Sequence, residues 1–515
     1  MTAISIFNDV LGPVMRGPSS SHTAAPYHIG RLARAFFGEV PAAVTFTFDP
    51  GGSIAEVYRE QGSDLGFATG VLGWSLADER FPRALELAEA EGINIVFTLA
   101  PVTEDDHPNA VRIRLRSGSG RELDLVAKST GGGALVFTRV AGWPVHITGN
   151  AHEVLMEASP GFEDEARRKL EEDGQVDHIH RQERGGRVLL HARRYTPLAQ
   201  QTLAWLQASP HVSGFWAAPP AFFTQRAGPL FASGAEMLAL AEARGQSLAD
   251  VALAYEATVL GLSEQDVLAE VHRRFDVMQQ AVQRGLSEDP GPMQLLRPTA
   301  HAVYQAEAQG WLAVGGLHTR AAARAMAVMH VNGAMGLVCA APTAGSAGTL
   351  PAVIVTLIED LGLSREDAAR ALLAASAIGL IVGTRATFAA EVAGCQVEIG
   401  AAGAMAAAAV VQAAGGSAQQ AADAAAIAFQ NTMGSVCDLV QGIVEIPCHT
   451  RNAVAASSAF VCADLILGGY QNPVPLDETI DAVFAVGQML PRELKVTALG
   501  GLAMAPSAQA LPRLR

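Results

Sequence analysis

Hydrophobic and polar positions alternate in short runs near the start of the chain. Residues 44–48 (Val-Thr-Phe-Thr-Phe) and 112–115 (Arg-Ile-Arg-Leu) place every second side chain on one face, which is the period of a half-buried strand. Residues 82–90 have the spacing of a helix, and residues 92–97 have that of another strand. The pattern predicts a multidomain chain that begins with an α+β domain over residues 1–147.

A second unit, residues 149–220, alternates strands and helices in a fixed order. The order β-α-β-β-α-β predicts a ferredoxin-like arrangement. With Ser159-Pro160-Gly161 at the start of the first helix, the unit resembles an ACT regulatory domain. A structural module of the same fold without a regulatory role is the alternative. We expect strands at 153–157, 177–182, 187–193 and 212–216, and helices at 162–172 and 197–207.

From residue 226 onward, the apolar positions follow a helical period. Val267, Val271 and Phe275 recur on one helix face. Capping boxes at Ser263–Asp266 and Ser364–Asp367 mark two helix starts. Strand alternation is absent from this pattern, so we expect an all-α domain over residues 226–515. Ala217-Ala218-Pro219-Pro220 is the expected linker into it.

The composition limits the class of protein. Half of the 515 residues are hydrophobic, which is enough for a large core, and the net charge of −15 argues against nucleic acid as a partner. Residues 399–422 carry no charge, but alanine and glycine dominate them, so we expect a buried helix and no membrane partner. The N-terminus lacks the basic region of a signal peptide, and we expect a cytoplasmic protein.

Three of the five cysteines lie in the last quarter of the chain, each among small or apolar residues. Cys395, Cys437 and Cys448 could bind an iron–sulfur cluster that leaves one iron open. The alternative is that they are small buried hydrophobic residues, as most free cysteines are. Zinc is disfavoured because no CxxC or HxxxH spacing accompanies them.

Two loops combine small residues with hydroxyl groups. Residues 17–23 read Gly-Pro-Ser-Ser-Ser-His-Thr and lead into a helix, where hydroxyls and N–H groups could bind a carboxylate or simply cap the helix. Residues 340–348 (Ala-Ala-Pro-Thr-Ala-Gly-Ser-Ala-Gly) let a backbone approach a ligand closely. A third segment, Lys128–Gly133, reads by itself as a flexible turn.

Taken together, four segments resemble the iron–sulfur-dependent L-serine dehydratases, or L-serine ammonia-lyases. They are residues 17–23, residues 341–348, Gly394-Cys395-Gln396-Val397-Glu398-Ile399-Gly400 and Ile446-Pro447-Cys448-His449-Thr450-Arg451-Asn452. The resemblance covers nearly the whole chain, with a β-type part, an ACT-like part and an α-type part fused in that order.

The resemblance implies an enzyme that eliminates water from L-serine and yields pyruvate and ammonia. It implies a 4Fe-4S cluster held by Cys395, Cys437 and Cys448, with Cys339 and Cys462 as packing residues. The ACT-like unit implies a homodimer. The resemblance and the polar loops give His22, Gln61 and Ser63 as catalytic candidates. The expected substrate-binding residues are Ser19, Ser20, Ser21, Thr23, Ser129, Gly131, Gly132, Thr343, Ala344, Gly345, Ser346, Arg451 and Asn452.

One position departs from the family pattern. The family carries His-Gly-Thr-Asp or His-His-Thr-Asp where this chain has Gln61-Gly62-Ser63-Asp64, and glutamine cannot take a proton at neutral pH. His22, Tyr58 or Glu60 could serve as the base instead. The alternatives to serine chemistry are another β-substituted amino or hydroxy acid, and a non-catalytic sensor of small acids.

Overall fold

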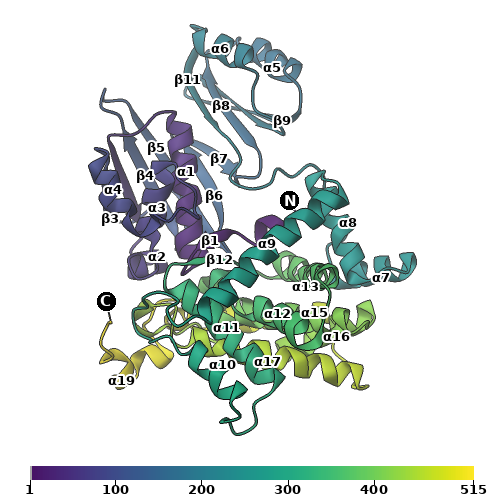
Figure 1. Cartoon of the computed structure of the whole chain (residues 1–515). Helices are drawn as coiled ribbons and strands as arrows, with labels where there is room; N and C mark the ends of the chain where they lie inside the picture. The colour runs from purple at the N-terminus through teal and green to yellow at the C-terminus, as the bar shows by residue number, and fades with distance from the viewer. Residues whose placement is uncertain (1–2, 515) are drawn as a thin grey trace.

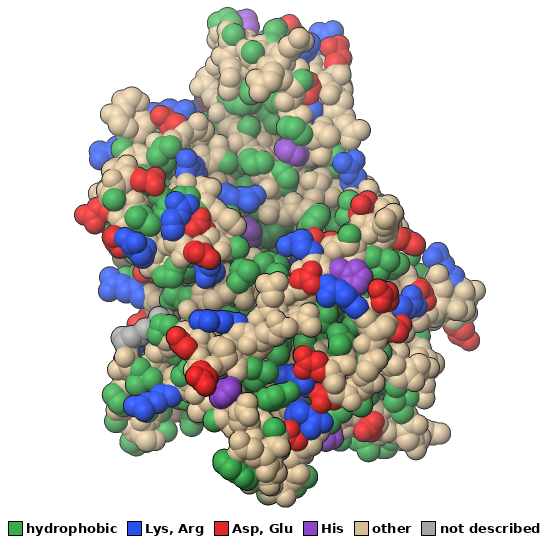
Figure 2. All heavy atoms as spheres, in the orientation of Figure 1, with side chains coloured by type: hydrophobic (Ala, Val, Ile, Leu, Met, Phe, Trp, Pro, Cys, Tyr) green, Lys and Arg blue, Asp and Glu red, His purple; other side chains and the backbone are tan. Residues whose placement is uncertain are grey.

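The computed structural model describes residues 3–514 as three parts (Figure 1). A mixed α/β part carries a six-stranded sheet, a small unit carries a four-stranded sheet, and the remainder of the chain is helical. The predicted multidomain organisation, mixed at the start and helical toward the end, is confirmed. On the face drawn in Figure 2, acidic and basic side chains are interspersed.

The first sheet has the strand order β3-β2-β4-β5-β6-β7. β2 and β3 are parallel and the other neighbours are antiparallel. Helices α1 and α3 pack on each other, and Phe67 of α3 stacks on Phe46 of β2 with ring centroids 4.2 Å apart. The bounds are α1 Ala25–Phe37, β2 Ala43–Phe48, α2 Ser53–Val57, α3 Ser63–Leu72, α4 Ala84–Ala90, β3 Asn94–Leu99, β4 Ala110–Arg116, β5 Glu122–Gly131, β6 Ala134–Val140 and β7 Trp143–Ile147.

The small unit has the element order predicted from the sequence. Its antiparallel sheet is ordered β11-β8-β10-β9. Ala217 and Ala218, expected in the linker, are the last residues of β11 and pair with β8, so the linker begins at Pro219. The bounds are β8 His152–Ala158, α5 Glu163–Glu172, β9 Val176–Arg184, β10 Arg187–Arg194, α6 Gln200–Ala208 and β11 Val212–Ala218.

The remaining helices enclose an alanine-rich core. Ser263 caps α9 in a full capping box with Asp266, as predicted. The helices are α7 Gly234–Arg244, α8 Leu248–Leu260, α9 Glu264–Gly285, α10 Ala300–Ala308, α11 Leu317–Gly333, α12 Thr349–Leu361, α13 Arg365–Arg385, α14 Ala390–Ala393, α15 Ile399–Ala413, α16 Ala418–Thr432, α17 Cys448–Leu467, α18 Leu476–Met489 and α19 Pro506–Gln509.

The expectation that this region contains helices alone is wrong at one point. β12 (Leu337–Cys339) pairs antiparallel with β1 (Val14–Arg16), which lies near the N-terminus. Three residues are too few to show a period of two, so alternation could not reveal this strand. The pairing joins the N-terminal segment directly to the helical part (Figure 1).

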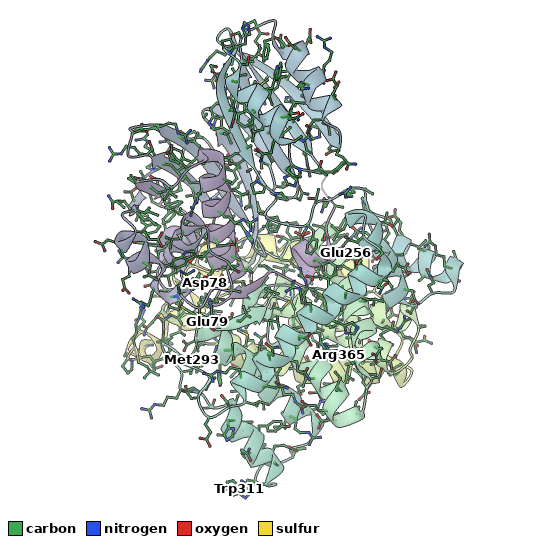
Figure 3. All side chains as sticks on the ribbon, turned by 45° about the horizontal axis from the view of Figure 1, so that its top comes forward. Asp78, Glu79, Glu256, Met293, Trp311 and Arg365 are labelled. Atoms are coloured by element: carbon green, nitrogen blue, oxygen red, sulfur yellow. The ribbon has the colours of Figure 1, made fainter. Side chains whose placement is uncertain are left out.

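The N-terminal segment is also held by a buried carboxylate. Glu256 of α8 accepts hydrogen bonds from the Ser5 hydroxyl (2.6 Å), the Ile6 N–H (2.8 Å) and the Phe7 N–H (2.9 Å). Figure 3 shows Glu256 beside the first turn of the chain. The chain therefore starts on the helical part before it enters the six-stranded sheet.

Among residues 3–514, three helical segments are long and apolar enough to cross a membrane: 344–361, 365–385 and 395–413. In the fold, 72%, 78% and 89% of the most apolar stretch of each segment is buried inside the protein, so these apolar surfaces are already covered. Of residues 399–422, those up to Ala413 belong to the buried helix α15. The expected buried helix is confirmed.

Candidate functional site

The three candidate ligand cysteines come together in one apolar cluster. Cys395 lies just before α15, Cys437 follows α16, and Cys448 is the first residue of α17. Their exposed fractions are 2%, 3% and 4%, and they share the cluster with Met329, Ile399 and Leu439, among others. All five cysteines of the chain are free thiols. The fold therefore gathers three residues that are 42 and 11 positions apart in sequence.

Burial dominates the electrostatics of this cluster. It raises the pKa of Cys395 to about 12, and it raises the pKa values of Cys437 and Cys448 well above their usual range. The Arg451 guanidinium opposes this effect on all three thiols. Arg451 is held by Asp438 (2.9 Å) and by the Val436 carbonyl (2.8 Å). One cation therefore faces three sulfur donors.

These residues fit an iron–sulfur cluster better than a single metal ion. Over residues 3–514, no group of three His, Cys, Asp or Glu side chains lies close enough to hold one ion. In a 4Fe-4S cluster each thiolate binds a different iron, so the sulfurs need not share one centre. Soft, buried thiols without a disulfide partner are the donors such clusters use. A cavity of about 350 Å³ lined by Cys395, Ser435, Arg451 and Val454 reaches this region.

The serine loop, residues 19–23, lies at the end of α1 that faces the helical part. Its hydroxyls are buried, and the Ser19 hydroxyl caps the turn by accepting from the His22 N–H (3.2 Å). The Ser129 hydroxyl donates to the Ser21 carbonyl (3.0 Å), and the Ser63 hydroxyl donates to the His22 carbonyl. Two residues predicted from separate segments therefore fix the backbone of this loop.

The second predicted loop, residues 343–346, contacts the serine loop across the interface between the mixed α/β part and the helical part. The Ala344 N–H donates to the Ser20 hydroxyl (3.4 Å), and the Thr343 and Ser346 hydroxyls lie 3.1 Å apart. The Asn452 amide donates to the Gly345 carbonyl (2.9 Å) and to the Cys448 carbonyl (2.9 Å). A continuous set of hydrogen bonds thus links the serine loop to a candidate ligand cysteine.

Gly131 and Gly132 lie at the same interface and supply no polar side chain. A Cβ on Gly131 would stand 2.5 Å from the Cβ of Ala389 and 2.8 Å from its backbone nitrogen, at φ +97°. Gly132 lies against the side chain of Phe388. At Gly131, the close approach of the two parts requires glycine.

Gln61 is buried, with an exposed fraction of 1%, and its side chain points into the helical part. The amide donates to the Gly442 carbonyl (3.3 Å), and the backbone carbonyl accepts from the Thr23 hydroxyl (2.6 Å). Within residues 3–514, its amide has no hydrogen bond to a hydroxyl or thiol of the predicted site residues. The Gln61 side chain therefore joins the mixed α/β part to the helical part.

His22 is fully buried, and burial lowers its pKa to about 4, so it is neutral at pH 7. Its two ring nitrogens face the Ser21 hydroxyl (2.8 Å) and the Ser53 hydroxyl (2.9 Å). Within residues 3–514, the side chains of Tyr58 and Glu60, the other candidates for the base, make no hydrogen bond to the serine loop. His22 is therefore the buried histidine of the serine loop, whereas His449, next to Cys448, lies 3.0 Å from His330.

Four polar residues in this region were not predicted from the sequence. Ser53 and Asn109 connect His22 to Glu391, and Glu398 lies near Gly345 and Thr343. Burial raises the pKa of Glu391 to about 7 and that of Glu398 to about 8. Glu398 could have been chosen from the sequence, because it lies in the same motif as Cys395. No sequence motif marks the loop that contains Asn109.

Comparisons with known proteins find similarity over both the α-type and the β-type parts. The family described as serine dehydratase alpha chain matches residues 235–503. The chain is 38% identical over 284 residues to the probable L-serine dehydratase alpha chain of Bacillus subtilis, covering 55% of this chain and 95% of that protein. It is 36% identical over 279 residues to the L-serine dehydratase alpha chain of Peptoniphilus asaccharolyticus, covering 54% and 96%. It is 40% identical over 152 residues to the probable L-serine dehydratase beta chain of B. subtilis, covering 30% and 67%.

Proposed function

This chain belongs to the serine dehydratase family, with alpha-type and beta-type parts in one polypeptide, and from that membership we propose that it converts L-serine to pyruvate and ammonia. The observation that carries the proposal is the connected site. Three buried, free cysteines share one cluster, and hydrogen bonds through Asn452 and Ala344 lead from Cys448 to the serine loop. The reaction class is that of a lyase.

We propose that Cys395, Cys437 and Cys448 hold a 4Fe-4S cluster. When bound, such a cluster supplies a Lewis-acidic iron that makes the β-hydroxyl of serine a better leaving group. Arg451 faces the same sulfurs and offsets part of their negative charge once they are thiolates. The burial of the three cysteines keeps bulk water away from their sulfur atoms.

The serine loop and the 343–346 loop supply the groups for substrate binding in this proposal. A carboxylate is best held by hydroxyls and by N–H groups at a helix start, and both are present between Ser19 and Thr23. Glu398 and Thr343 present oxygen atoms suited to an ammonium group. These roles follow from donor and acceptor chemistry.

We further propose that the unit between β8 and β11 is a ferredoxin-like, ACT-like regulatory domain and that the enzyme is a cytoplasmic homodimer. The support for the domain is its βαββαβ order and the β11-β8-β10-β9 sheet. The support for the location is that the three helical segments long and apolar enough to cross a membrane, among residues 3–514, are mostly covered by protein.

The cysteines provide the test of the proposed function. We expect anaerobically purified protein to contain iron and sulfide and to form pyruvate from L-serine. Cys395→Ala, Cys437→Ala and Cys448→Ala should each lose the cluster and the activity, because each removes one of three protein ligands. Iron content and pyruvate formation are the measurements.

Cys339→Ala and Cys462→Ala are the matched controls. Both cysteines are as buried as the ligand candidates, at 1% and 4% exposed, but they lie outside the cluster that holds the other three. We expect both variants to retain iron and activity. Serine turnover by iron-free wild-type protein, or an equal loss in Cys339→Ala, would contradict the proposal.

A further inference from the structure

A row of hydrogen bonds runs from the serine loop into the helical part. The Ser21 hydroxyl lies 2.8 Å from His22 Nδ1, and His22 Nε2 lies 2.9 Å from the Ser53 hydroxyl. The Ser53 hydroxyl lies 3.0 Å from Asn109 Oδ1, and Asn109 Nδ2 lies 3.3 Å from Glu391 Oε1. The row crosses the interface between the two parts and ends on α14, four residues before Cys395.

A single backbone donor fixes the direction of the row. The Ile54 N–H lies 3.3 Å from Asn109 Oδ1 and can only donate, so Oδ1 is an acceptor and Nδ2 faces Glu391. The Ser53 hydroxyl then donates to Oδ1, and its oxygen must accept from His22. His22 therefore carries its proton on Nε2. Because burial keeps the ring neutral, Nδ1 has a free lone pair and accepts from the Ser21 hydroxyl.

We propose that Asn109 and Glu391 are positioning residues that hold His22 as the Nε2–H tautomer, so that the Ser21 hydroxyl, bonded to His22 Nδ1, takes the α-proton of the substrate. This inference rests on the proposed function. As the Cα–H bond breaks, its proton goes to Ser21 Oγ and the proton of Ser21 moves to His22 Nδ1. The electron pair forms the Cα=Cβ bond and hydroxide leaves Cβ. His22 then returns its proton through Ser21 to the hydroxide, which completes a water molecule.

The other polar groups around this row of hydrogen bonds support the proposed proton transfer. Ser129 and Ser63 bind the backbone carbonyls of Ser21 and His22, which fixes the loop and leaves both side chains free for the proton transfer. The second oxygen of Glu391 is buried without a hydrogen-bond partner among residues 3–514. Glu391 Oε1 accepts from Asn109 Nδ2, and this bond holds the amide and, through Ser53, the imidazole of His22 in place.

The tautomer can be read directly by ¹⁵N NMR of histidine-labelled full-length protein, with His22→Gln used to assign the signal. We expect wild-type His22 to show a protonated Nε2 and an unprotonated Nδ1 at pH 7. Ser53→Ala removes the acceptor of the Nε2 proton and should give a mixture of tautomers. A protonated Nδ1 in the wild type would overturn the proposal, whatever the activity of the protein.

Kinetics test the consequence for the reaction. Loss of a hydrogen-bond partner that orients a metal-ligating histidine typically costs about 10–100-fold, and we apply the same scale to His22. We expect a fall of that size in kcat for Ser53→Ala and Glu391→Ala, with KM for L-serine and iron content close to wild type. Glu391→Gln retains an oxygen that accepts from Asn109 and should recover most of kcat.

Three results would overturn the proposal: wild-type kcat in Ser53→Ala, a loss expressed only in KM, or no difference between Glu391→Gln and Glu391→Ala. Ser53→Ala keeps the test decisive if a Glu391 variant fails to fold. A wild type that contains iron but does not consume serine would contradict the proposed function instead, and the NMR result would still decide the tautomer.

Discussion

At the scale of single residues, two carboxylates stand close together where the chain begins. Asp9 accepts from the Ser5 N–H (2.8 Å), while Glu256 binds the Ser5 hydroxyl and the two following N–H groups. Burial, together with the negative charge of Glu256, raises the pKa of Asp9 to about 7. The folded protein therefore holds a proton on Asp9 that the unfolded chain releases near pH 4.

Between about pH 4 and pH 7 the folded state binds more protons, so this group lowers the free energy of unfolding as the pH rises. Asp9→Asn keeps an oxygen acceptor and removes the titration. Since Asp9 is partly exposed, we expect the stability of the variant relative to wild type to improve by about 1–2 kcal/mol between pH 5 and pH 8.

Thermal unfolding of both proteins at the two pH values measures this change. Asp106→Asn, at an exposed position, is the control and should follow the wild type. A constant difference between Asp9→Asn and wild type across the range would show that Asp9 is ionised in the folded protein.

At the scale of elements, the turn between β5 and β6 shows how closely the two parts approach. Gly131→Ala would place a methyl group 2.5 Å from Ala389, and the segment that contains Ala389 leads directly into Glu391. Gly120→Ala is the matched control, because Gly120 also has positive φ (+88°) but nothing lies within 4 Å of its Cβ position. The comparison separates backbone strain from crowding.

We expect Gly120→Ala to cost about 1–2 kcal/mol through backbone strain alone and to leave serine turnover unchanged. Gly131→Ala should lower the melting temperature further and reduce turnover, since the 388–391 segment must shift. Melting temperature and kcat are measured side by side. Equal losses in the two variants would show that the interface accommodates the methyl group.

Some of these elements and contacts could be predicted from the sequence, and others could not. Alternation and helical periods identified β2, β4 and the order of the small unit, because those patterns are local. The motifs identified Cys395, Cys437 and Cys448 as a set. Asn109 and Glu391 were missed because their function depends on a contact between residues 282 positions apart. The pairing of β1 with β12 was missed for the same reason.

At the scale of the whole molecule, the small unit lies at one end of the molecule (Figure 1), where Trp143 of β7 donates to Glu157 of β8 (2.8 Å). Gly161 has φ +95° in the turn before α5, with open space around its Cβ position. If this unit carries regulation in a dimer, the L-serine saturation curve of the wild type should be sigmoidal. Gly161→Val should make the curve hyperbolic while iron content and maximal turnover persist.

Gly185→Val is the control for this prediction, since Gly185 also has positive φ (+60°) and open space, in the turn between β9 and β10. We expect its saturation curve to match that of the wild type. Analytical ultracentrifugation gives the size of each protein. A monomeric wild type with a hyperbolic saturation curve would contradict the regulatory role and show that the small unit is a structural module.

The contact between the serine loop and the 343–346 loop has one more consequence. The similar proteins of B. subtilis are named as separate alpha and beta chains, whereas here both contributions lie on one polypeptide. A covalent tether replaces a concentration-dependent encounter with a fixed effective concentration. The two halves of the site are thus made in equal amounts by one round of translation, and dilution cannot separate them.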